Sequence, residues 1–283
     1  MSALTQADLP ALIRPIAGGL PTGFVMILLS SFVFGLIFGS FLNVIIYRLK
    51  TRQNMVFGGS FCPECKNKLK WLDLVPILRF IFLRGRCRYC NKNISWQYPI
   101  VEILSGLIWV SIFYQNFNNN FQFSIFNFQS ITFLYQIFIF STLLIVAVYD
   151  FKWKIVPDKV IYPAIAIALI YNIFSPDNGG LWGALLTAVA AFLFFYLIFY
   201  FSKGKAMGMG DAKLAILIGL FLSPKMALMA FVLAFVIGAV SGIILMVFDR
   251  KTLKSQIALG PFVVIGATIA FFFSSIINNI IIF

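Results

Sequence analysis

The sequence predicts an all-α polytopic membrane protein with about eight transmembrane helices and one small polar module between the first and the second. Two observations predict this class. Hydrophobic residues make up 61% of the 283 residues and charged residues 11%, against roughly 45–50% and 25% in an ordinary soluble domain. One long stretch alone has a soluble domain's composition, and it carries all four cysteines. Long apolar runs fill most of the remaining chain.

The apolar runs give the order of the elements. Residues 1–22 contain three prolines and a Gly-Gly pair but no basic region followed by a cleavable apolar core, so we interpret them as a short extracytoplasmic arm. The polar stretch covers residues 48–98 and lies between the first two spans. We predict spans at 23–47, 99–116, 131–149, 157–174, 180–202, 212–223, 226–248 and 257–282.

The basic residues set the topology. If the chain alternates through eight spans, the loops at 48–98, 150–159, 203–213 and 249–256 fall on one side and hold 20 of the 22 Lys and Arg residues. Lys and Arg gather in cytoplasmic loops, so this side is the cytoplasm and the protein is predicted to be a multi-pass protein of the cytoplasmic membrane. The same bias explains the net charge of +13, and no nucleic-acid motif accompanies it.

The chain contains no histidine. This absence excludes Ser-His-Asp and Cys-His catalysis, and every zinc site with a histidine ligand. Carboxylates, cysteines and lysines are the remaining candidates for chemistry. Only nine residues are acidic, so an acidic residue at the end of a membrane span requires an explanation.

The cysteines have the spacing of a four-thiolate zinc site. Cys62 and Cys65 form one C-x2-C pair, and Cys87 and Cys90 form a second pair 21 residues later. Two disulfides or four unpaired thiols are the alternatives, but a cytoplasmic loop lies in a reducing compartment, which disfavours disulfides. We therefore predict a structural Zn²⁺ that holds a small cytoplasmic module together, because a tetrahedron filled by protein ligands leaves no position for a reactive water.

Two aspartates are the candidate catalytic residues. Asp150 ends the third predicted span, and Asp211 follows Gly208-Met209-Gly210 at the start of the sixth. Both fall on the cytoplasmic face, where two close carboxylates would share a proton as in aspartic proteases. The glycines would permit close approach of an extended peptide. The alternative is that these aspartates cap helix starts or pair with lysines; for Asp158 we predict such a capping role.

Other polar residues have structural and functional interpretations side by side. Asn43 and Glu102 lie within spans near the cytoplasmic face, where polar groups are costly unless they are paired or functional. They either hold the zinc module to the helices by hydrogen bonds or contribute to a ligand site. We interpret Asp73 and Asp249 as solvated loop charges.

Several motifs occur in a fixed order along the chain. They are GSFLNVIIYR at 39–48, the two cysteine pairs, RGRCRYC at 84–90, YPIVE at 98–102, the aspartate and proline at 150 and 157, and GMGD at 208–211. Together they resemble the bacterial type IV prepilin leader peptidases, which are membrane aspartic proteases with a Gly-x-Gly-Asp signature. The resemblance covers the chain from about Gly39 to Gly260.

The resemblance implies a function and roles for residues. Asp150 and Asp211 would be the catalytic pair, within a protease core at about 131–282 of the helical bundle 99–283. The substrates would be type IV prepilins or pseudopilins, whose short basic leader ends in glycine and is cut at the cytoplasmic membrane face. Members of this cysteine-bearing form also N-methylate the new terminal residue with S-adenosylmethionine. For that activity the resemblance points to the region 48–98 with Gly85 and Arg86, and Asn43 and Glu102 are the further candidates.

Two other functional classes fit parts of the sequence. A transporter or channel could use intramembrane carboxylates to bind protons or cations, but it would favour carboxylates near the bilayer midplane and two similar halves. The aspartates lie at the edge of the membrane, and no internal repeat is present. A non-catalytic scaffold built on the zinc knuckles would tolerate loss of both aspartates.

Overall fold

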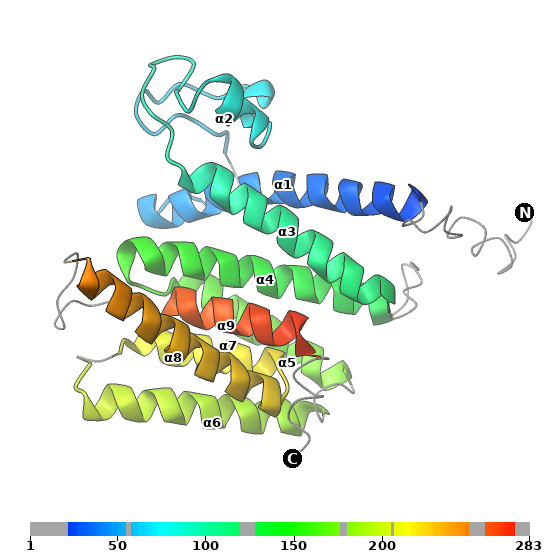
Figure 1. The fold of residues 1–283 in the computed structure, drawn as a ribbon, viewed down its shortest axis with the longest axis vertical. Coiled ribbons are helices and arrows are strands. Elements are labelled where there is room, and N and C mark those ends of the chain that lie inside the picture. Colours follow the sequence, from blue (N-terminus) through cyan, green and yellow to red (C-terminus); the bar gives the residue numbers. More distant parts are fainter. Residues whose placement is uncertain are drawn as a thin grey trace, which may run out of the picture. The chain divides into compact units, whose positions relative to one another are not determined.

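The computed structural model describes residues 22–54, 58–118, 128–175, 180–204, 207–248 and 258–274. Within these ranges the regular elements are helices, with two isolated β-bridges in the module that carries the cysteines (Figure 1). The predicted all-α class is confirmed. The predicted extracytoplasmic arm and Asp249 lie outside the described residues.

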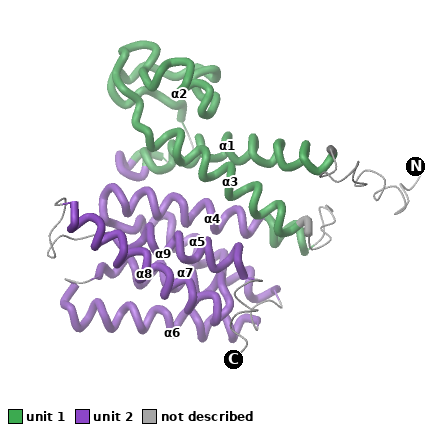
Figure 2. The backbone as a smooth tube through the Cα atoms, viewed as in Figure 1, with its two compact units in different colours: residues 1–48, 53–133 green, residues 49–52, 134–283 purple. Residues whose placement is uncertain are grey.

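The chain forms two compact units (Figure 2). The first unit comprises residues 1–48 and 53–133, and the second comprises residues 49–52 and 134–283. Helix α3 (Gln97–Asn118) belongs to the first unit together with the polar module.

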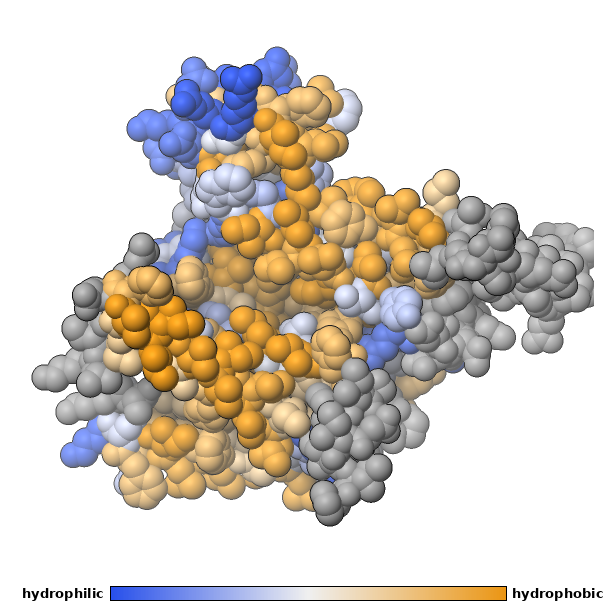
Figure 3. Space-filling view, viewed as in Figure 1, coloured by the Kyte–Doolittle hydropathy of each residue, from blue (hydrophilic) through white to orange (hydrophobic). Residues whose placement is uncertain are grey.

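The first unit combines two membrane-length helices with the module. Its elements are α1 (Thr22–Thr51), the 3-10 helix η1 (Trp71–Leu74), α2 (Leu78–Phe82) and α3 (Gln97–Asn118). Hydrophilic side chains gather on the module in Figure 3, whereas α1 exposes apolar side chains such as Met26 and Phe34. This distribution is the one expected of a small polar domain carried by helices that face lipid.

The second unit is a helical bundle built around α7. Its elements are α4 (Phe128–Trp153, most of which lies in this unit), α5 (Asp158–Phe174), α6 (Gly180–Phe201), α7 (Met209–Phe221), α8 (Pro224–Val247) and α9 (Gly260–Phe272). Helix α7 packs against α5, α6, α8 and α9, and its Leu214, Leu217 and Ile218 are fully buried. Helix α6 exposes Trp182 and Leu186 instead. A central buried helix therefore carries the Gly-Met-Gly-Asp motif.

Five helices of the described chain are long and apolar enough to cross a membrane: α1, α3, α4, α6 and α8. The predicted number of eight is not confirmed. Helices α5, α7 and α9 occupy the positions of the other three predicted spans but have 17, 13 and 13 residues, fewer than the roughly 20 that a span needs. The final predicted span ran to residue 282, and the residues after 274 lie outside the described chain.

Candidate active site and metal centre

Asp211 is positioned by its own motif. Gly208 is the N-cap of α7, and Asp211 is the third residue of the helix. The Asp211 carboxylate turns back and accepts a hydrogen bond from the Gly208 N–H, at 3.2 Å to Oδ2. The N–H groups at a helix start have no partner within the helix, so an acidic side chain at this position is favoured by hydrogen bonding and by the helix dipole. The helix begins at Met209, inside the glycine-rich turn.

The two glycines of the motif have different surroundings. A Cβ atom on Gly210 would lie 2.8 Å from Cγ2 of Val156, which is buried. A Cβ atom on Gly208 would meet nothing closer than 3.7 Å, and Gly208 is exposed. Gly210 is therefore required by contact with this chain's own segment after α4. The predicted close approach of a peptide applies only to Gly208.

Asp150 is positioned by a distant part of the chain. It lies near the end of α4, and only 5% of its surface is exposed. Its Oδ2 accepts a hydrogen bond from the N–H of Gly260, the first residue of α9, at 3.0 Å. These two residues are 110 positions apart. A Cβ atom on Gly260 would lie 2.6 Å from the same oxygen, so this contact requires glycine.

The two aspartates lie in the same unit and interact electrostatically. Two carboxylates that are held close together cannot both ionise without cost, so such a pair would share a proton. Each uses Oδ2 to accept a backbone N–H from a glycine at a helix start. Both carboxylates are thus oriented by the backbone, as general acid and base catalysis would require.

Asp158 does not belong to this pair. Its Oδ1 accepts a hydrogen bond from Lys213 Nζ at 2.6 Å, and the lysine also lies over the ring of Tyr162. The predicted capping role for Asp158 is wrong, because the N-cap of α5 is Pro157 and Asp158 is the first residue of the helix. The pair with Lys213 instead connects the start of α5 with the start of α7.

The four cysteines come together in the module. Their sulfur atoms all lie within 4.8 Å of one another, and Cys62 Sγ and Cys90 Sγ are 4.0 Å apart. No disulfide links these cysteines. Four sulfurs around one Zn²⁺ at about 2.3 Å would be separated by roughly 3.8 Å, so a small contraction would complete a tetrahedral site. The cluster fits a single metal ion.

Both cysteine pairs adopt the same local structure. The N–H of Cys62 donates to Asn67 O and the N–H of Cys87 donates to Lys92 O. In each pair the residue after the second cysteine has a positive φ, 60° at Lys66 and 55° at Asn91, and a β-bridge closes the loop. Backbone N–H groups also point at the sulfur atoms. Although burial raises the pKa of Cys87, the N–H groups of Tyr89 and Cys90 lower it to about 7.

A half-buried ion pair connects the second cysteine pair with η1 and α2. Asp73 accepts hydrogen bonds from Tyr89 Oη at 2.9 Å and from the Lys70 N–H, and it pairs with Arg79. Burial raises the pKa of Asp73, but the Lys70 N–H, Tyr89 and the charge of Arg79 outweigh this effect and lower the pKa below its usual value. The prediction that Asp73 is a solvated loop charge is wrong, because only 4% of its side chain is exposed.

Comparisons with known proteins identify the family of this chain. Residues 33–116 match the model of the bacterial peptidase A24 N-terminal domain, and residues 137–243 match that of the type IV leader peptidase family. The chain is 30% identical to a prepilin leader peptidase/N-methyltransferase of Bacillus subtilis, over 86% of this chain and 92% of the relative. The chain belongs to the type IV leader peptidase family.

Other relatives in the leader peptidase family have the same name. That of Vibrio cholerae is 31% identical over 88% of this chain and 97% of the relative, and that of Klebsiella pneumoniae is 34% identical over 68% and 85%. No solved structure matches the chain. Family membership and the apolar helices together make this an enzyme of the inner membrane.

In this leader peptidase, Asn43 joins α1 to the start of α3, and Glu102 of α3 holds the residue before α2 in the module. Asn43 Nδ2 donates to Tyr98 O, and Asn43 Oδ1 accepts from Gln97 Nε2. Glu102 Oε2 accepts from the N–H of Ile77 at 2.8 Å. Both side chains are buried. These contacts are hydrogen bonds of the kind expected for a structural role of Asn43 and Glu102. A role of the two residues in a ligand site remains a prediction.

Gly85 and Arg86 lie elsewhere in the module, at the start of the second cysteine loop. Gly85 has a φ of +69°, and its carbonyl accepts the N–H of Ile94. Arg86 is exposed. Glycine at this position is explained by the left-handed turn that leads into Cys87. Neither residue is among the hydrogen-bonding partners of Asn43 or Glu102 described above.

Two residues of the candidate active site, Val156 and Gly260, were not predicted as site residues from the sequence. Val156 and Gly260 both contact the aspartate motifs, yet neither carries a chemical group that marks a site. Gly260 also lies outside both segments matched by the family models. The only sequence signal was a glycine directly before a proline at the start of an apolar run, which is typical of a helix start.

Proposed function

We propose that this enzyme is an aspartic endopeptidase that uses Asp150 and Asp211 to remove the short basic leader from type IV prepilins or pseudopilins. The observation that carries the proposal is the pair of interacting carboxylates, each oriented by a glycine N–H at a helix start. The relatives' name, prepilin leader peptidase/N-methyltransferase, supplies the substrate class and the second activity.

The cleavage step follows from the shared proton. One carboxylate takes a proton from a water molecule as that water attacks the scissile carbonyl carbon, and the other donates its proton to the carbonyl oxygen. Collapse of the resulting diol breaks the C–N bond, and the proton returns to the departing amine. Gly208 is exposed beside Asp211, so an extended leader can approach the pair from this side.

Cleavage takes place at the cytoplasmic face of the membrane in this proposal. The loops near Asp150 and Asp211 belong to the set that holds 20 of the 22 basic residues, as cytoplasmic loops do. The apolar segment of a prepilin would lie in the bilayer beside the helices while its leader reaches the aspartates. Membrane lipid and the prepilin are thus the expected partners.

The metal in the module is proposed to be Zn²⁺, bound by Cys62, Cys65, Cys87 and Cys90. Four thiolates and no histidine are typical of structural zinc, and the ion would stabilise the fold of the module without activating water. Elemental analysis of the purified protein should give one zinc per chain. Replacing Cys87 with Ser should lower this value to near zero.

The methyltransferase activity is proposed for the first unit, with S-adenosylmethionine as methyl donor. Support comes from the relatives' name and from the match of residues 33–116 to the N-terminal family model. Gly85, Arg86, Asn43 and Glu102 are the candidate residues. The test is transfer of labelled methyl from S-adenosylmethionine to the new terminus of a cleaved pilin. Correct cleavage without any transfer would leave the module a purely structural element.

The decisive experiment for cleavage compares three aspartate variants in reconstituted membranes. Asp150→Asn and Asp211→Asn should each lower prepilin cleavage by at least about a thousandfold, because each removes one of two essential proton-transfer groups. Asp158→Asn is the matched control on the same unit and should keep activity within about threefold, because its partly exposed ion pair contributes little. Retained cleavage in either of the first two variants would refute the assignment.

A further inference from the structure

The first turn of α9 leaves one backbone N–H, that of Gly260, without a partner within the turn. Its N-cap is Leu259, whose side chain cannot accept a hydrogen bond. The N–H groups of Phe262 and Val263 donate to Leu259 O, and Pro261 has no N–H. The N–H of Gly260 is the remaining donor of this first turn, and Asp150 Oδ2 accepts it. Asp150 therefore acts as the cap of a helix that begins 110 residues later.

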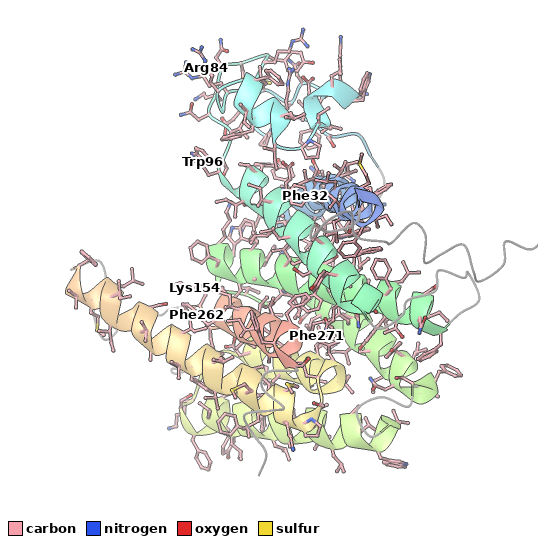
Figure 4. All side chains as sticks on the ribbon, turned by 45° about the vertical axis from the view of Figure 1, so that its right-hand side comes forward. Phe32, Arg84, Trp96, Lys154, Phe262 and Phe271 are labelled. Atoms are coloured by element: carbon pink, nitrogen blue, oxygen red, sulfur yellow. The ribbon has the colours of Figure 1, made fainter. Side chains whose placement is uncertain are left out.

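Helix α9 is held in place on its other side. A Cβ atom on Gly266 would lie 2.2 Å from Ala230 O of α8, so the two backbones are in direct contact. Phe262 and Phe271 project from α9 in Figure 4, and Phe271 contacts Phe140 and Phe221. The N–H of Gly260 is therefore fixed relative to α4 and α7, the two helices that carry the aspartates.

The space around the Asp150 carboxylate leaves no room for a side chain at position 260. A Cβ atom there would lie 2.6 Å from Oδ2, 3.1 Å from Cγ and 3.3 Å from Cβ of Asp150. Helix α9 is fixed by packing, whereas an aspartate side chain can rotate about two bonds. A methyl group at position 260 would therefore displace the carboxylate rather than the helix.

We propose that Gly260 is a positioning residue for catalysis, which fixes the Asp150 carboxylate through its N–H and through the absence of a side chain. The hydrogen bond occupies Oδ2 and leaves Oδ1 for the attacking water and the shared proton. This inference rests on the proposed role of Asp150. It adds a third segment, at the start of α9, to the two segments that carry the aspartates.

The test compares Gly260→Ala with two controls in the reconstituted enzyme. Gly260→Ala should lower kcat for prepilin cleavage by about a hundredfold, because a displacement of about 1 Å costs that much, while KM stays within about threefold. Gly238→Ala adds the same methyl group on α8, where the nearest atom is 3.5 Å away in Phe262, and should leave kcat unchanged. Pro261→Ala changes the same helix start without placing an atom against Asp150, and should also keep kcat near the wild-type value.

If Gly260→Ala is unstable, a double-mutant cycle that combines it with Asp150→Ala still tests the inference through the unfolding temperature. Removing the carboxylate creates the space that the methyl group needs, so Gly260→Ala should lower the unfolding temperature less in the Asp150→Ala background than in the wild type. An equal loss in both backgrounds, a wild-type kcat in Gly260→Ala, or an equal loss of kcat in Pro261→Ala would overturn the inference. Asp150→Asn is assayed in parallel, because its retained activity would refute the dyad itself, whereas an inactive Asp150→Asn with an active Gly260→Ala would refute only the role of Gly260.

Discussion

The two aspartates have the same kind of backbone partner but acquire it in different ways. Asp211 accepts the N–H of Gly208, three residues earlier in its own motif, and it is half-buried. Asp150 accepts the N–H of Gly260, 110 residues later, and it is buried. The first contact forms as soon as the turn of α7 forms. The second exists only when α4 and α9 are packed together, so the orientation of Asp150 depends on the whole bundle.

Among substitutions that disturb the local positioning of Asp211, Gly210→Ala should cause the largest loss of activity. The added Cβ would lie 2.8 Å from Val156, so the start of α7 and Asp211 with it must shift, and we expect a loss of about a hundredfold in kcat. Val156→Gly removes both side-chain atoms in conflict, Cγ2 at 2.8 Å and Cβ at 2.9 Å. The double variant should recover at least tenfold over Gly210→Ala, and a failure to recover would show that the contact with Val156 does not determine the position of Asp211.

A smaller effect is expected for Gly208→Ala. The new methyl group meets nothing within 3.7 Å and the φ of −84° suits any residue, so the unfolding temperature and kcat should be unchanged. Because Gly208 is exposed beside Asp211, the methyl group should obstruct the leader peptide and raise KM several-fold. Steady-state kinetics on a leader peptide separate these parameters, and a fall in kcat with constant KM would contradict this role.

The smallest effect is expected at the ion pair that joins α5 and α7. Lys213→Ala removes a contact whose aspartate is more than half exposed. Such pairs contribute about 0.2–1 kcal/mol, so the unfolding free energy should fall by no more than this and cleavage should stay within threefold. A loss of activity comparable to that of Gly210→Ala would show that Lys213 acts directly on Asp211.

Much of the architecture could be predicted because it depends on local patterns. Apolar runs placed eight helices in the correct order, and turn chemistry explains both cysteine loops and the link from Asp211 to Gly208. Helix lengths were predicted less well. The sixth predicted span, 212–223, is short unless its helix begins inside the glycine-rich turn, and α7 does begin there, at Met209.

The long-range contacts could not be predicted from the sequence. The contacts of Asp150 with Gly260 and of Gly210 with Val156 depend on how the helices pack. The identity of a glycine or an apolar residue does not indicate which residue it will contact. Asp73 looked like an isolated acidic loop residue, since its partner Tyr89 lies 16 positions further along the chain, in the second cysteine loop. In each case the missing information was a contact between segments rather than a residue type.

Asp150 and Asp211 are proposed to work as one catalytic unit, although one is positioned locally and the other by the bundle. The most direct test measures the cleavage rate of Asp150→Asn, Asp211→Asn and the double variant on the same prepilin in reconstituted membranes. Residues that act as a unit are not additive, so all three rates should agree within about threefold at the residual level. A single variant that keeps a tenth or more of the wild-type rate, with a further large loss in the double variant, would contradict the claim.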